Sequence, residues 1–171
     1  MITFPHSRLQ IWPHFCLNII DEINLLCPGS YYLKGSNGSG KSSFINQVFL
    51  PIMRERTDLH LIVLQQQMHL QLYALRAWAA IYYPGRIVAN ETDVWELLWD
   101  DLTALKDDKP VFVVADEAHN IRIPEGLTHP VCLIYSSHNY QIQADNVLEF
   151  KPISPDESEL RLLAEDALCA H

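Results

Sequence analysis

A glycine-rich stretch, placed between a strand-like and a helix-like segment, constrains the fold of this chain more than any other feature. Residues 35–43 read GSNGSGKSS and fit the phosphate-binding pattern G-x-x-x-x-G-K-[ST] without a mismatch. Residues 31–33 before it indicate the end of a strand, and residues 43–50 after it predict a helix with an apolar stripe. Strand, glycine turn and helix start are the context that this pattern requires. Residues 35–43 are called the glycine-rich loop below.

The residue types of the glycine-rich loop suit the phosphates of a nucleotide. Its glycines let the backbone curl tightly and approach a phosphate without a Cβ in the way, and the following helix directs its positive end and free N–H groups to the same place. Lys41 supplies a positive charge for the β- and γ-phosphates, and Ser42 supplies a hydroxyl for Mg²⁺. The alternative is a glycine-rich surface turn that happens to precede Lys-Ser. The expected ligands of the nucleotide are Gly35, Ser36, Asn37, Gly38, Ser39, Gly40, Lys41, Ser42 and Ser43.

Composition favours one soluble domain over residues 1–171, with 49% hydrophobic and 19% charged residues. The net charge of −9 argues against a nucleic-acid surface, which needs a basic face. The four cysteines form no C-x-x-C pair and are interpreted as reduced thiols of a cytosolic protein. No signal peptide is evident, and no apolar run approaches the roughly 20 residues of a membrane span. We expect a cytoplasmic protein that meets the inner face of a membrane, if at all, through a partner.

Strand-like and helix-like segments alternate along the chain, which predicts an α/β fold with a mostly parallel central sheet and helices on both faces. The expected strands are 15–26, with a turn near Asp21, and 31–33, 59–64, 111–115, 131–135 and 146–150. The expected helices are 41–56, which Pro51 should end or kink, 68–82, one that opens with a capping box at Asp93, and 154–170.

Polar side chains follow three of these apolar strands, where the carboxyl ends of parallel strands gather ligands. Gln66, the pair Asp116-Glu117, and His138 hold these places. Two adjacent carboxylates at the end of a buried strand are costly unless a cation is present. We therefore assign Asp116 to Mg²⁺ and Glu117 to the polarisation of an attacking water. The alternative is a solvated strand end.

The order of these motifs resembles that of the ABC-type ATPases: glycine-rich loop, Gln66, Asp116-Glu117, His138. Residues 23–30 and 143–150 also resemble segments that flank the family's motifs. The resemblance implies a P-loop NTPase fold that binds and hydrolyses Mg-ATP. It implies that Gln66 contacts Mg²⁺ and the water, although Gln65 and Gln67 are alternatives, and that His138 contacts the γ-phosphate. Trp12 lies where the family places an aromatic ring on adenine, with Phe15 as the alternative.

The chain also departs from that family. No Leu-Ser-Gly-Gly-Gln signature is found; residues 90–93 occupy its place, and the stretches 67–90 and 117–138 are short. The chain thus resembles a pared-down ABC core with a reduced helical subdomain. The resemblance implies an ATPase subunit that acts on a partner protein, a membrane transport component or another assembly, and a nucleotide-dependent homodimer.

Two other functions compete with this interpretation. One is a nucleotide-binding switch module without catalysis, which the missing signature favours. The other is a nucleic-acid motor, because residues 116–119 spell the DEAH motif of helicases. Such motors need two domains and a basic track, whereas this chain has the length of one domain and is acidic. Dependence of phosphate release on Glu117 would separate an enzyme from a switch.

Overall fold

The structure is a computed structural model that describes residues 1–64, 68–117, 129–137 and 144–163. Within these residues, strands form one large sheet in the order β2-β3-β10-β9-β5-β8-β7-β6 and a small antiparallel ribbon, β1-β4. The strands of the large sheet are β2 Ser7–Trp12, β3 Phe15–Ile19, β5 Gly29–Lys34, β6 His60–Leu64, β7 Val111–Ala115, β8 Val131–Tyr135, β9 Asn146–Ser154 and β10 Glu157–Leu163; the ribbon is β1 Ile2–Phe4 and β4 Ile23–Leu25.

The strands β9, β5, β8, β7 and β6 are parallel neighbours and form one end of the large sheet, with β6 at its edge. Their apolar, β-branched sequences suit strands that are covered on both faces; all five residues of β7 are buried. The strands expected at 31–33, 59–64, 111–115 and 131–135 are therefore confirmed. The fold is α/β with a mostly parallel mixed sheet.

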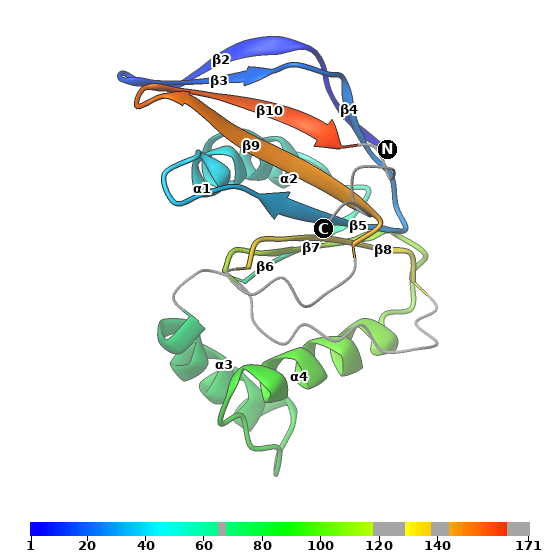
Figure 1. Ribbon diagram of the computed structural model, residues 1–171. Helices are drawn as coiled ribbons and strands as arrows, with labels where there is room; N and C mark the ends of the chain where they lie inside the picture. The colour runs from blue at the N-terminus through cyan, green and yellow to red at the C-terminus, as the bar shows by residue number, and fades with distance from the viewer. Residues whose placement is uncertain (65–67, 118–128, 138–143, 164–171) are drawn as a thin grey trace.

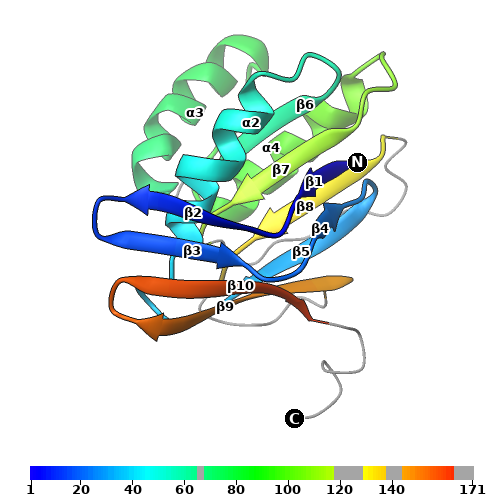
Figure 2. The ribbon, with the colours of Figure 1, turned by 90° about the horizontal axis from the view of Figure 1, so that it is seen from above.

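The other end of the sheet, from β9 to β2, is partly antiparallel. Strands β9 and β10 form a hairpin, and β3 pairs parallel to β10 and antiparallel to β2 (Figure 2). The helix expected over 154–170 is wrong as far as residue 163. Burial alternates along β10, with Ser158 and Leu160 buried and their neighbours more exposed, which is the period of a strand. Residues 164–170 lie outside the described residues.

The helix after the glycine-rich loop runs without a break through α1 (Lys41–Phe44), a π-helical turn η1 (Ile45–Phe49) and α2 (Leu50–Arg54). The sequence predicts that Pro51 ends or kinks this helix; the helix does not end there but continues to Arg54. The Leu50 N–H donates to Ile45 O, the i→i+5 bond of a π turn. This wider turn lies directly before a proline ring that would crowd the normal turn and that has no N–H to donate.

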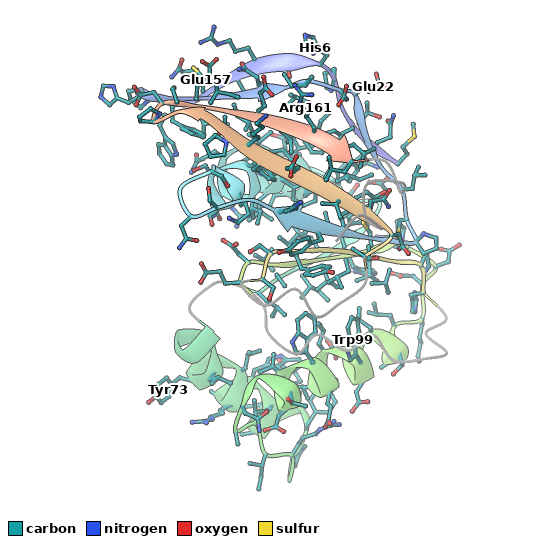
Figure 3. All side chains as sticks on the ribbon, in the orientation of Figure 1. His6, Glu22, Tyr73, Trp99, Glu157 and Arg161 are labelled. Carbon is teal, nitrogen blue, oxygen red and sulfur yellow. The ribbon has the colours of Figure 1, made fainter. Side chains whose placement is uncertain are left out.

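Helices cover both faces of the sheet (Figure 1). On one face, Phe44, Phe49 and Leu50 of the first helix pack between the parallel strands and β1, β3 and β4 in one apolar cluster. On the other face, α3 (Met68–Tyr82) and α4 (Glu91–Ala104) form a second cluster with the sheet. Trp99 of α4 points toward the sheet, whereas Tyr73 of α3 points away from it (Figure 3).

The start of α4 corrects one detail of the expected helix. The N-cap is Asn90, whose side chain accepts the Asp93 N–H at 3.2 Å, and Asp93 accepts the Asn90 N–H at 3.1 Å. Asp93 therefore closes the capping box as its third helical residue and does not open it. No helix in the described part of the chain has the length and apolar character needed to cross a membrane.

Candidate functional site

The glycine-rich loop connects β5 to the first helix, and neighbouring residues pack closely against its glycines. A Cβ on Gly35 would lie 2.5 Å from Ser39 Oγ and 2.7 Å from Phe150 O. Gly40 has φ +98°, and a Cβ there would lie 2.7 Å from Cζ of Phe15. Both positions therefore require glycine, one for close approach and one also for its backbone conformation. The loop has the tightly curled form that its sequence predicts.

A cavity of about 480 Å³, called the loop pocket below, opens between the glycine-rich loop and the end of β7. The loop pocket brings together three groups that the sequence separates widely: the loop, the upstream aromatics and the two carboxylates. Gly35 and Ser36 instead line an adjacent polar cavity of about 850 Å³. The residues of the loop pocket are Trp12, Phe15, Asn37, Gly38, Ser39, Gly40, Lys41, Ser42, Ser43, Asp116 and Glu117.

Lys41 folds back over the loop that precedes it. Its Nζ donates to Gly35 O at 2.6 Å and to Ser36 O at 2.9 Å. Burial lowers the pKa of Lys41, while the carboxylates of Asp116 and Glu117 oppose that shift. Two loop carbonyls therefore hold the ammonium group of this lining residue of the loop pocket, and a bound anion would compete with them for it.

Asp116 and Glu117 follow β7 and are tied to the neighbouring strand β8. The strands pair in register from Val111 with Val131 to Ala115 with Tyr135, so Ser136 lies beside Asp116. The Ser136 hydroxyl donates to Asp116 Oδ1 at 2.7 Å and accepts the Glu117 N–H at 2.8 Å. Asp116 is buried, and Glu117 has φ +55°, a left-handed conformation that is uncommon for a residue with a side chain.

The sequence alone does not single out Ser136. The feature that could have marked it as a site residue is its position, because it is a polar residue that directly follows an apolar strand, as Asp116 does. Because β7 and β8 are adjacent and in register, these two positions meet. The hydroxyl was therefore a candidate only once the order of the strands was known.

The two aromatic candidates lie on either side of the β2-β3 turn and both reach the glycine-rich loop. Trp12 pairs with Phe15 in the sheet. The indole N–H of Trp12 donates to Ser43 Oγ at 3.2 Å, and 47% of the residue remains exposed. Phe15 is more buried and its ring lies against Gly40. Both residues line the loop pocket; Trp12 is the more exposed of the two, and Phe15 also supports Gly40.

The residues present fit Mg²⁺ held together with a nucleotide. Mg²⁺ prefers oxygen ligands and is commonly bound through one or two carboxylates plus substrate phosphates. The Ser42 hydroxyl and the Asp116 carboxylate both line the loop pocket, and a carboxylate can accept further contacts beside the bond on Oδ1. Among the described residues, no group of three or more His, Cys, Asp or Glu could hold a metal ion by itself.

Two of the expected site residues, Gln66 and His138, lie outside the described residues, as do the alternatives Gln65 and Gln67. Their assignments remain predictions. The strands that precede them, β6 and β8, end at Leu64 and Tyr135. In comparisons with known proteins, no family model matches the chain and no curated protein sequence matches it.

Proposed function

We propose that the chain is a P-loop NTPase domain that binds Mg-ATP in the loop pocket and hydrolyses it, in the manner of the ABC-type ATPases. The observation that carries this proposal is the convergence of Lys41, Asp116 and Glu117 on one cavity beside the glycine-rich loop. A cation, a metal-directed carboxylate and a second carboxylate are the groups that phosphoryl transfer to water uses.

The chain's own residues divide the work as follows. The loop N–H groups and Lys41 hold the β- and γ-phosphates, with Lys41 exchanging the carbonyls of Gly35 and Ser36 for phosphate oxygens. The Ser42 hydroxyl and Asp116 hold Mg²⁺, which supplies positive charge to the phosphates. Glu117 orients a water and takes its proton as the water oxygen bonds to the γ-phosphorus and the bond to the bridging oxygen breaks.

A partner protein is the second part of the proposal. Large apolar side chains are exposed on α3 and in the segment that connects it to α4. Tyr73 is 73% exposed, Ile81 71%, Tyr82 65% and Ile87 81%. Large exposed apolar side chains can serve as contacts for a partner protein. We infer that the ATPase acts from the cytoplasm on a transport component or another assembly.

Turnover of ATP per chain, measured across a range of protein concentrations, tests the proposed activity. We expect phosphate release above that of the Lys41→Ala chain. A specific rate that rises with concentration would mean that two chains complete the site, and a constant rate would mean that one chain suffices. Intact ATP binding without any release would favour the switch module, and absence of both from a folded chain would contradict the proposal.

The exposed ring of Trp12 provides a separate prediction about the adenine base. We expect Trp12→Ala to weaken ATP binding about fivefold or more, because a stacked base contributes about 1–3 kcal/mol, and Trp12→Phe to retain most of the affinity. Tripolyphosphate has no base, so its binding should not change. Calorimetric titration with both ligands measures this.

The variant Phe15→Ala is the matched comparison. Because Phe15 supports Gly40, its loss should weaken ATP and tripolyphosphate alike. The reverse pattern, with base-dependent loss at Phe15 and none at Trp12, would assign the stacking ring to Phe15.

A further inference from the structure

We propose that Ser136 is a positioning residue that sets the two carboxylate-bearing residues of the loop pocket for Mg²⁺-nucleotide. This inference rests on the proposed function and deepens it. Ser136 does not line the loop pocket and acts through Asp116 and Glu117. Its hydroxyl makes one hydrogen bond to each of them, and these two bonds differ in direction.

The first bond fixes the carboxylate that faces the metal. The hydroxyl donates its single proton to Asp116 Oδ1 at 2.7 Å, so the carboxylate cannot rotate without losing this bond. Ser136 is 1% exposed, so water does not readily replace its hydroxyl.

The second bond fixes the backbone that carries the proposed base. Glu117 has φ +55°, where a side chain is disfavoured unless its surroundings hold it. The Glu117 N–H donates to Ser136 Oγ at 2.8 Å and thereby holds this conformation. The Ser136 N–H in turn donates to Ala115 O at 3.0 Å, which anchors the serine to the end of β7.

One hydroxyl therefore couples the metal-directed carboxylate to the base. An alanine at this position leaves the Glu117 N–H and the Asp116 carboxylate without the shared partner. Threonine keeps the hydroxyl, and cysteine keeps a side chain of similar size with a weak donor. The three substitutions thus separate the hydrogen bonds from the packing of the side chain.

Ser158 offers a matched control. It is also 1% exposed, and its Oγ has no hydrogen-bond partner among the described residues. It lies on β10, opposite Pro152 of β9 and Leu17 of β3, away from the loop pocket. Ser158→Ala removes the same atom from an equally buried serine without touching the proposed site.

The test is a titration of Mg²⁺ into the full chain with a fluorescent ATP analogue, alongside thermal unfolding of each variant. We expect Ser136→Ala to raise the half-saturating Mg²⁺ concentration about 10-fold, the lower end of what partners behind a metal ligand contribute. Affinity for the nucleotide without Mg²⁺ should stay unchanged. Ser136→Thr should restore the response, and Ser158→Ala should match the wild type.

Four outcomes would overturn the inference. A Ser136→Ala curve that superposes on the wild-type curve would contradict the positioning role and leave the proposed function standing. An equal loss of affinity with and without Mg²⁺ would do the same. Absence of Mg²⁺-dependent nucleotide binding by the wild-type chain removes the proposed function and this inference with it. If Ser136→Ala does not fold, Ser136→Cys carries the same test, and an unchanged Mg²⁺ response in that variant would contradict the role.

Discussion

Replacement of Lys41 by alanine should abolish tight ATP binding. The Lys41 Nζ lies at the glycine-rich loop, 2.6 Å from Gly35 O, and lines the loop pocket. Each hydrogen bond to a charged group contributes about 1.5–3 kcal/mol, so loss of two phosphate contacts should weaken binding roughly 100-fold or more. Calorimetric titration of ATP in the presence of Mg²⁺ measures the loss.

Lys109→Ala is the matched control for this variant. The Nζ of Lys109 also donates to a backbone carbonyl, Thr57 O at 3.0 Å, but lies outside the loop pocket. We expect its ATP affinity to equal that of the wild type. Wild-type affinity in a folded Lys41→Ala chain would place the phosphates elsewhere and contradict the assignment of the loop.

Replacement of Glu117 by glutamine should preserve ATP binding and stop turnover. Glutamine has nearly the same shape and keeps the backbone N–H that bonds to Ser136, but it cannot accept the proton of the attacking water. Loss of a general base lowers the rate about 10²–10⁴-fold. Phosphate release and calorimetry on the same preparation measure turnover and affinity separately.

Glu96→Gln provides the control for Glu117→Gln. Glu96 lies on α4, pairs with Arg86 at 3.8 Å and is largely exposed. Its substitution should change neither turnover nor affinity. If the Glu117→Gln chain retained turnover, Glu117 would not be the base, and a loss of ATP binding in that chain would show that the carboxylate serves binding instead.

The parallel strands were predictable because their signal is local. Residues 111–115 are all apolar, three of them are β-branched valines, and every one of them is buried in β7. The glycine-rich loop was equally visible because its whole pattern lies within residues 35–43, although its glycines also approach distant residues, Gly35 the Phe150 carbonyl and Gly40 the Phe15 ring. The α/β class follows from these segments and from the alternation of helices with them.

The hairpin of β9 and β10 was not predictable from local pattern. Pro155 suits the first turn of a helix as well as a tight turn between strands, and residues 157–163 mix charged and apolar types. Their state depends on partners far away in the sequence: Glu157 lies opposite Cys16, and Asn18 donates to the Glu157 carboxylate at 2.7 Å. This long-range pairing makes residues 157–163 a strand and not a helix.

The residues of the candidate site also differ in whether local sequence or long-range structure identifies them. Lys41, Asp116 and Glu117 could be named from the residues that surround them in the sequence. The role of Ser136 depends on the register of β7 against β8, and the greater exposure of Trp12 over Phe15 depends on how the β2-β3 turn meets the glycine-rich loop. Neither can be derived from residue type and spacing.

Equilibrium titration of ATP into the wild-type chain, with and without Mg²⁺, tests the central claim most directly. The account predicts saturable binding of one ATP per chain that tightens when Mg²⁺ is added, because Ser42 and Asp116 line the same pocket as Lys41. Absence of saturable binding by a folded chain under both conditions would contradict it.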